Sequence, residues 1–315
     1  MARGSFVISL DFEIGWGLVD HSKEYILAYK ESNTKNAVIA LGRIRETLKK
    51  YNMKLTVCYV GAIGLKDFDD FKVKAPASPS YTRHGLSPQQ MLEDLKELKE
   101  QPELFFQPDV IRSLAEDDMI ELGTHTFIHY FCAEPGQTLN EFENDIKTAV
   151  VNAPKPLKSI IFPRNQVEQC YLSICKKYGF THYRGMRENA LWKIGPKKKG
   201  YSLRRALRLI DTYIPLIGSN SYNVVDNECL RDIPGSAFLR PYSKKLHFLE
   251  GLKTWRICWS MKRAARKGEV YHLWWHPHNF GANMDRNIEE LEKICKCYVK
   301  LNKKYAMESR FMSEL

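Results

Sequence analysis

Three features that would assign the chain to a familiar class are missing from its 315 residues. No apolar run approaches the ~20 residues that a membrane-spanning helix needs. The opening residues, MARGSFVISLDF, reach a carboxylate too early for an export signal. The eight cysteines are scattered, without the C-x2-C spacing of a zinc ribbon. We therefore expect reduced thiols in a protein of the cytoplasm, with no transmembrane segment.

Acidic residues are too few to balance the basic ones. Lys and Arg number 48 against 37 Asp and Glu, which gives a net charge of +11. Basic runs lie at residues 197–199, 204–208 and 262–267. Such a surface attracts anions, for example the phosphates of a nucleotide or lipid carrier, or an acidic membrane face in peripheral contact. Alternatively, each run is simply solvated. No nucleic-acid-binding module accompanies the charge, so we expect no nucleic acid among the partners.

Short β-branched segments alternate with amphipathic helices along the chain. Strands are predicted at 5–11, 54–60, 119–125, 157–162, 180–184 and 269–276. Helices end at a stop residue just before three of these strands, at Asn52, Gly179 and Gly268. This order is typical of βα units and a parallel sheet. We predict an α/β barrel that forms one domain over residues 1–315, with a loop insertion near 62–88 and a helical extension near 285–315.

Polar residues that do not suit a core stand where four of the predicted strands end. Asp11 and Glu13 close the first strand, and His125 and His129 close the third. The fourth and last strands end in FPRNQ (162–166) and WWHPHNFG (274–281). Because the carboxyl ends of parallel barrel strands share one rim, these residues are expected to converge there.

The His125-x3-His129 pair has the spacing at which two imidazoles on one helical turn grip a single metal ion. Asp11 and Glu13 are two residues apart on an extended segment, so both face the same side. Glu13 would complete a two-His, one-carboxylate zinc shell, and Asp11 would accept a proton from the metal-activated water. Alternatively, the histidines lie on the surface and the carboxylates face solvent.

These motifs, in this order, resemble those of the polysaccharide deacetylases, carbohydrate esterase family 4. The matching segments are SLDFE, LTVCYVG, ELGTHTFIHY, IIFPRN and HLWWHPHNFG, and the resemblance covers about residues 5–285. The resemblance is greatest to a branch with Asp-Phe-Glu as first motif, which is associated with surface-polysaccharide biosynthesis. It implies a distorted (β/α)7 barrel and metal-dependent hydrolysis of N-acetyl or related C–N amide groups.

The resemblance also implies a role for each site residue. Asp11 takes the position of the general base, Arg164 that of the arginine that hydrogen-bonds the base, and His276 that of the acid that protonates the leaving amine. The metal ligands would be Glu13, His125 and His129. The metal implied is Zn2+, with Co2+, Ni2+ or Mn2+ as alternatives. Two departures stand out: the family's adjacent aspartates are spaced here, and its Arg-x-Pro motif reads Pro163-Arg164-Asn165.

Further residues near the motifs are candidates for substrate binding. Trp16 would stack on a sugar ring or plug the barrel mouth, and Arg184 would meet an anionic group or form a structural salt bridge. Of Trp274 and Trp275, which alternate along a strand, one is core and the other lines the pocket. The set predicted to bind substrate is Trp16, Trp275, His278, Asn279 and Arg184. Trp255 and Trp259 form either a membrane-facing surface or core packing.

The predicted function is removal of an N-acetyl group from an amino sugar in surface-glycan assembly. The basic final third of the chain suggests a nucleotide-linked or lipid-linked substrate. One alternative is a cyclic imide or ureide hydrolase on the same metal site, because relatives with a spaced carboxylate pair open such rings. Alternatives of other classes are a catalytically silent glycan-binding barrel and a basic scaffold on a membrane or nucleic acid.

Overall fold

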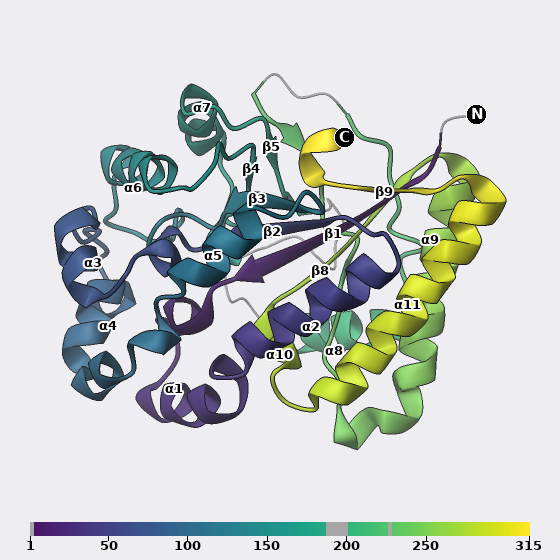
Figure 1. Ribbon diagram of the computed structural model, residues 1–315, viewed down its shortest axis with the longest axis horizontal. Coiled ribbons are helices and arrows are strands. Elements are labelled where there is room, and N and C mark those ends of the chain that lie inside the picture. Colours follow the sequence, from purple (N-terminus) through teal and green to yellow (C-terminus); the bar gives the residue numbers. More distant parts are fainter. Residues whose placement is uncertain (1–2, 187–200, 226–228) are drawn as a thin grey trace.

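The computed structural model describes residues 3–186, 201–225 and 229–315. Its strands run in parallel around a curled sheet (Figure 1). Their bounds are β1 Ser5–Phe12, β2 Leu55–Tyr59, β3 Ile120–Thr124, β4 Ser159–Ile160, β5 His182–Tyr183, β6 Arg231–Asp232, β7 Ala237–Phe238, β8 Val270–Trp275 and β9 Glu308–Arg310. The hydrogen-bonded order is β6-β5-β4-β3-β2-β1-β8-β7, and β9 pairs with β1 outside this path.

One short segment closes the sheet into a barrel. β6 pairs with β5, and β7, which begins only five residues after β6 ends, pairs with β8. Backbone bonds continue on both sides, from Ile233 N to Tyr183 O (2.9 Å) and from Leu239 N to Trp274 O (2.9 Å). The segment therefore acts as one broken strand that bridges both edges. The result is the distorted seven-stranded barrel that the sequence predicts.

Helices surround the barrel. They are α1 Lys23–Tyr29, α2 Ala37–Lys50, α3 Phe68–Lys74, α4 Pro88–Asp94, α5 Pro108–Ala115, α6 Leu139–Val151, α7 Gln169–Lys177, α8 Tyr201–Asp211, α9 Glu250–Lys267, α10 Pro277–Phe280 and α11 Met284–Tyr305. Figure 1 shows α2, α11 and α9 side by side along one flank. Within the described ranges, none of these helices has the length and apolarity to cross a bilayer.

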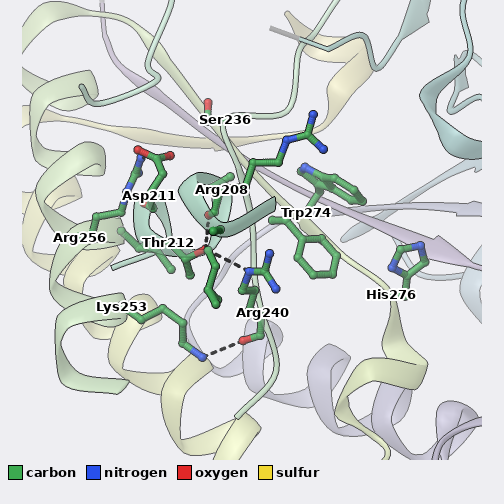
Figure 2. A pocket seen from close by; sticks show the side chains of 14 residues that line it. Arg208, Asp211, Thr212, Ser236, Arg240, Lys253, Arg256, Trp274 and His276 are labelled. Atoms are coloured by element: carbon green, nitrogen blue, oxygen red, sulfur yellow. Dashed lines mark hydrogen bonds and ion pairs between the residues drawn. The ribbon is translucent and has the colours of Figure 1, made fainter. Parts of the chain in front are cut away.

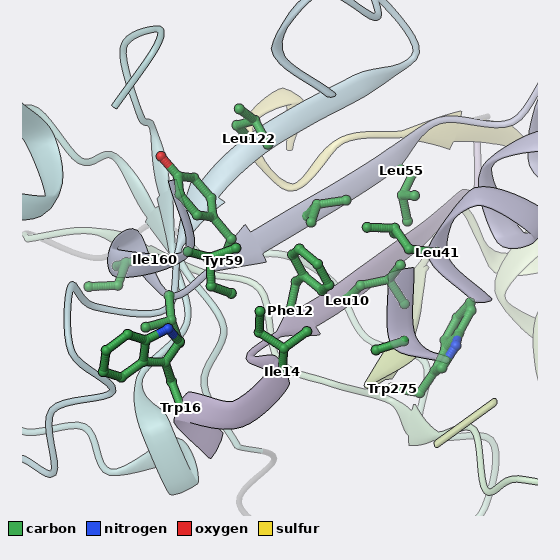
Figure 3. Close-up of a cluster of buried hydrophobic side chains, with 14 of the residues drawn as sticks. Leu10, Phe12, Ile14, Trp16, Leu41, Leu55, Tyr59, Leu122, Ile160 and Trp275 are labelled. Carbon is green, nitrogen blue, oxygen red and sulfur yellow. The ribbon is translucent and has the colours of Figure 1, made fainter. Parts of the chain in front are cut away.

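Successive side chains of β1 point alternately to the two sides of the sheet. On β1, Phe6, Ile8, Leu10 and Phe12 belong to the large core between sheet and helices, of which Figure 3 labels Leu10 and Phe12. Val7 belongs to a smaller cluster inside the barrel. The inward side of β1 becomes polar toward its carboxyl end, where Ser9 and Asp11 follow Val7 with the same period of two. The carboxylate of Asp11 is thus continuous with the barrel lining.

Two features predicted from the sequence differ in detail from the structure. The insertion near 62–88 is not all loop, because it contains α3, which Asp67 caps by accepting hydrogen bonds from the backbone N–H groups of Asp69 and Asp70. The C-terminal extension is not all helical, because after α11 the chain returns to the sheet as β9. Met312 then enters the cluster inside the barrel. Of the basic runs, residues 197–199 lie outside the described residues.

Candidate active site

Three imidazoles from two strand ends surround one carboxylate oxygen of Glu13, which follows a third strand. Glu13 Oε1 lies 2.9 Å from His125 Nε2, 3.4 Å from His129 Nε2 and 3.3 Å from His276 Nε2. Asp11 Oδ2 lies 3.6 Å from the same nitrogen of His276. These groups line a pocket of about 370 Å³. The structure therefore brings together the predicted ligands and two of the predicted catalytic residues.

The Gly-Trp-Gly sequence after Glu13 makes room for its carboxylate. The chain leaves β1 as a short 3₁₀ helix, Ile14–Leu18, which folds back against the Glu13 side chain. A Cβ atom at Gly17 would overlap the Glu13 carboxylate, and one at Gly15 would overlap the ring of Phe105. Both glycines are needed because another side chain or backbone occupies the space that a Cβ would take.

The His125–His129 segment is a strained loop and not the helical turn that the spacing suggested. Thr126 and His129 both have positive φ, 64° and 61°. The buried carboxylate of Asp145 on α6 holds the loop by accepting hydrogen bonds from Phe127 N (2.7 Å) and Ile128 N (3.0 Å). Positive φ at non-glycine residues is costly and persists where the surroundings enforce it, which is typical of functional sites.

The donors fit a divalent metal. His125 Nδ1 lies 2.8 Å from Ile161 O, which directs Nε2 toward Glu13. His125 Nε2 is buried and makes no well-aligned hydrogen bond, which is costly without a ligand. Two groups, Glu13–His125–His129 and Asp11–Glu13–His276, each have donor atoms close enough to share an ion. Two imidazoles with one carboxylate form a common catalytic zinc shell.

Arg184, and not Arg164, pairs with the predicted base. Its Nη1 donates to Asp11 Oδ1 and its Nη2 to Asp11 Oδ2, both at 2.6 Å, and both residues are almost fully buried. Nη1 also donates to Ser9 Oγ (3.2 Å), and the guanidinium lies 4.0 Å above the Trp274 ring. The alternative that Arg184 forms an ion pair is therefore what the structure shows, and its prediction as a substrate contact is wrong because it lies beneath the pocket.

Arg164 lies at the pocket rim. It occupies a turn with φ 56°, donates to Asp20 Oδ2 at 2.8 Å and stacks over Phe131 at 3.9 Å. The expected hydrogen bond from Arg164 to Asp11 is therefore wrong. The left-handed turn after β4 carries the side chain out of the barrel lining, while Arg184 extends the inward face of β5.

Replacing Arg184 by Gln is expected to shift the acidic limb of the kcat–pH profile to higher pH. Burial tends to raise the pKa of Asp11, but the charge of Arg184, then those of His276 and His125, hold it below its ordinary value. Without Arg184 that pKa rises, so the base form is lost at a higher pH. The check is kcat measured against pH for Arg184→Gln beside Arg164→Gln.

Arg164→Gln should leave the acidic limb where it is. Removing either Asp11 or Arg184 alone leaves the other charge buried without its partner, which should destabilise the fold by about 3–5 kcal/mol. The double variant Asp11→Asn with Arg184→Gln should lose less stability than the two single variants added together. An unmoved acidic limb in Arg184→Gln would contradict the pairing.

The charged groups around the site suit a general base, Asp11, next to a general acid, His276. Burial tends to raise the pKa of Glu13, but the charges of His276 and His129 and the close imidazoles of His125 and His129 hold it well below its usual range. Burial tends to lower the pKa of His276, but the charge and hydrogen bond of Glu13 and the charge of Asp11 raise it above its ordinary value. Asp11 and Glu13 are therefore anionic at neutral pH, and His276 is poised to donate a proton.

His278 and Asn279 line the pocket, and their contact with a substrate stays a prediction. The His278 ring stacks on that of His276, with centroids 4.9 Å apart. Burial and the neighbouring His276 lower the pKa of His278 to about 3, so it is neutral. Asn279 Nδ2 donates to Tyr29 Oη at 3.2 Å, whereas its Oδ1 is buried without a hydrogen bond.

Both predicted tryptophan contacts are wrong. Trp16 is fully buried, packs among Phe71, Phe105 and Phe106, and donates from Nε1 to Phe105 O at 2.8 Å. Trp275 is also fully buried, on the outward side of β8. Its neighbour Trp274 lines the pocket instead. Trp16 thus belongs to the large core and neither stacks on a sugar nor plugs the barrel mouth. The β8 pair alternates as expected, but Trp274 is the pocket residue and Trp275 the core residue.

Sequence reasoning missed part of the pocket wall. His21, Tyr25 and Tyr29 stack in succession, with ring centroids 4.3 and 5.2 Å apart, and all three line the pocket. Their spacing of four residues, His21-x3-Tyr25-x3-Tyr29, was a usable signal for one helix face. Phe238 and Asp20 also line the pocket. They carried no such signal, because their partners are distant in sequence.

No known family profile and no curated protein sequence matches the chain. Solved structures do. A Mycobacterium smegmatis protein named a polysaccharide deacetylase matches with a TM-score of 0.59 at 10% identity, over 100% of this chain and 92% of that one. A Pseudomonas aeruginosa PAO1 protein, also named a polysaccharide deacetylase, matches with a TM-score of 0.54 at 11% identity, over 99% and 88%.

An allantoinase structure matches with a TM-score of 0.55 at 10% identity, over 99% of this chain and 87% of the other. At these identities the likeness establishes the fold. The chain has the distorted (β/α)7 barrel of the polysaccharide deacetylases, which confirms the predicted fold class. That barrel is shared with at least one hydrolase of a different name, so the chemistry has to be argued from the site.

Proposed function

We propose that the protein is a metal-dependent hydrolase that removes an N-acetyl group from an amino sugar. The observation that carries this proposal is the buried cluster in which Glu13, His125 and His129 surround a position beside both Asp11 and His276. It offers a metal shell, a base and an acid within one pocket, in a fold shared with proteins named polysaccharide deacetylases.

The residues divide the reaction between them. Glu13, His125 and His129 would hold a divalent ion, which when bound polarises the amide carbonyl and lowers the pKa of a water molecule. Asp11, oriented by Arg184, accepts the proton of the attacking water. His276, whose pKa is raised, donates a proton to the departing nitrogen. The amide and water thereby become acetate and a free amine.

Zn2+ is the metal that this proposal assigns, because two imidazoles and one carboxylate are typical of catalytic zinc. The proposal also places the enzyme in the cytoplasm, as a single domain acting in surface-glycan assembly. An aromatic wall supports a sugar substrate: Tyr25, Tyr29, Phe238 and Trp274 line the pocket and offer ring faces or edges to a pyranose.

Acetate release tests the proposal. The purified protein, loaded with Zn2+, is incubated with a panel of N-acetylhexosamine compounds, and acetate is quantified beside the metal content. Acetate from at least one sugar supports the proposal. Ring opening of allantoin without acetate from any sugar would favour the ureide hydrolase, consistent with the allantoinase match. Failure to bind any divalent ion would favour a silent glycan-binding barrel.

Peripheral contact with an anionic membrane belongs to the same proposal, and the exposed face of α9 supports it. Trp255 is 52% exposed and its ring stacks on Trp259, 6.4 Å between centroids, while Arg263 lies 5.3 Å over Trp259. Core packing does not account for this pair. Leu252 and, just before the helix, Phe248 are also exposed. One helix face thus begins apolar and ends basic, which suits an interface with acidic lipid.

Trp255→Ser is expected to weaken binding to phosphatidylglycerol-containing vesicles about tenfold, because the indole no longer enters the interface. Co-sedimentation with vesicles measures the effect, with pure phosphatidylcholine vesicles binding much less. Val73→Ser, which removes an exposed apolar side chain from α3, is the matched control and should change nothing. Equal binding of wild type to both vesicle types would count against the membrane contact.

A further inference from the structure

The terminal nitrogens of Arg184 have two further partners besides Asp11. Nη1 donates to Ser9 Oγ at 3.2 Å and Nη2 to Asn165 Oδ1 at 3.3 Å, in addition to the two bonds of 2.6 Å to the Asp11 carboxylate. The Trp274 ring covers the guanidinium at 4.0 Å. Because a bidentate pair fixes the relative orientation of its two planar groups, whatever holds Arg184 also orients Asp11.

The Ser9 hydroxyl is in turn bonded to a buried histidine of β8. His272 Nε2 lies 2.7 Å from Ser9 Oγ, and its Nδ1 lies 3.0 Å from Ile233 O. A carbonyl oxygen only accepts, so Nδ1 carries the proton and Nε2 is the acceptor. Ser9 therefore donates its hydrogen to His272 and keeps its oxygen as an acceptor for Arg184. This hydrogen-bond chain runs in one direction, from Arg184 through Ser9 to His272.

His272 has the charge state that this direction requires. The residue is fully buried, and burial together with the charge of Arg184 lowers its pKa to about 3, so the ring is neutral at neutral pH. A protonated ring would present a second N–H to the Ser9 hydroxyl, which would then have no acceptor for its own hydrogen. The neutral ring with its proton on Nδ1 is thus the form that lets Ser9 accept from Arg184.

Strand periodicity places the hydrogen-bond chain beneath the pocket. On β1, Ser9 precedes Asp11 by two residues and shares its inner side. On β8, His272 stands in the same way before Trp274 and His276, which line the cavity of about 680 Å³ drawn in Figure 2. Ser9 and His272 are fully buried and line neither this cavity nor the catalytic pocket. They therefore act on a substrate only through the groups above them.

We infer that Ser9 and His272 are positioning residues for the general base, an inference that rests on the proposed hydrolase function. His272 orients the Ser9 hydroxyl, whose oxygen holds Nη1 of Arg184. Arg184 in turn sets the plane of the Asp11 carboxylate. A base accepts a proton efficiently only when it is held within hydrogen-bonding reach of the attacking water. The hydrogen-bond chain thus contributes to kcat without touching the substrate.

Ser9→Ala is expected to lower kcat about tenfold, the scale of one hydrogen bond to a charged group. Acetate release by the zinc-loaded protein measures this effect, and KM and zinc content should stay as in the wild type because Ser9 lies below the pocket. The matched control is Ser159→Ala, which removes another fully buried hydroxyl, one that donates to Glu121 Oε1 at 2.6 Å, and should leave kcat unchanged. Wild-type kcat in Ser9→Ala would overturn the inference.

Two replacements of His272 separate the roles of its two nitrogens. Gln places an oxygen near the position of Nε2 and can still accept from Ser9, whereas Asn places its amide near Nδ1 and keeps only the bond to Ile233 O. We expect His272→Gln to retain kcat within about threefold and His272→Asn to lose about tenfold. A His272→Asn protein as active as His272→Gln would overturn the role of His272, because a residue that only packs would not distinguish the two.

A double-mutant cycle with Arg184 separates positioning from packing. In the Arg184→Gln background, Ser9→Ala should change kcat by less than about twofold, because no guanidinium remains for the hydroxyl to hold. Equal losses in both backgrounds would overturn the inference, since a purely structural loss does not depend on Arg184.

The wild type distinguishes failure of this inference from failure of the proposed function. If it opens allantoin and releases no acetate, the same variants are compared on ring opening, and the same outcomes decide the inference. If it turns over neither, the cycle is measured as the free energy of unfolding in urea. Less-than-additive losses for Ser9→Ala and Arg184→Gln would then retain the hydrogen-bond chain and reject the hydrolase, whereas additive losses would reject both.

Discussion

His125→Ala is expected to abolish both metal binding and acetate release. The Nδ1 of His125 is held by Ile161 O, so its Nε2 is fixed toward Glu13 as a ligand atom that alanine cannot supply. A bound metal contributes several kcal/mol to such a reaction and supplies hydroxide near neutral pH. The loss in kcat should therefore be at least about 10³-fold. Metal content by atomic emission and acetate release are measured on the same sample.

The control is His84→Ala, which removes an exposed imidazole near α4. This variant should keep the metal content and turnover of the wild type. A His125→Ala protein that retains its metal and its activity would place the ion elsewhere and would reject the ligand set. Loss of metal with an unchanged melting temperature would show that the ion serves the reaction more than the fold.

Asp11→Asn is expected to lower kcat by about 10²–10⁴-fold, the usual contribution of a positioned base. The amide has nearly the shape of the carboxylate but cannot accept the proton of water at neutral pH. Glu13, His125 and His129 remain, so the metal content should be unchanged. Acetate release and metal analysis together distinguish this outcome from that of His125→Ala.

Asp20→Asn is the matched control, because Asp20 is another pocket carboxylate that pairs with an arginine, Arg164. It should retain most of the activity. The buried Arg184 loses its counter-charge in Asp11→Asn, so a lower melting temperature is expected there, and turnover is compared at a temperature where both variants are folded. Wild-type kcat in Asp11→Asn would move the base to another group.

Residue periodicity explains both the successful and the failed parts of the sequence analysis. Asp11 and Glu13 were predicted to face one site because positions two apart on a strand share a face, and the structure places them together. The same rule, applied from His276, assigns Trp274 to the inner face and Trp275 to the helices. The choice of Trp275 therefore assigned it to the wrong side of β8, and the same two-residue rule could have corrected this from the sequence.

Residue periodicity could not decide which arginine pairs with Asp11. Arg164 and Arg184 both follow short strands, and each has the charge that Asp11 requires. A left-handed turn at Arg164 and the inward face of β5 at Arg184 decide between them. Nothing local in the sequence marks a non-glycine residue for positive φ, because the surrounding packing enforces that conformation.

The sequence by itself determined six of the strands and which histidine and carboxylate side chains come together at their ends. These follow from local periodicity and from polar residues at strand ends, which short-range rules describe well. Only the tertiary structure decided which arginine supports Asp11 and which tryptophan lines the pocket. The physical reason is that each of these depends on distances between segments far apart in the chain, which folding alone brings together.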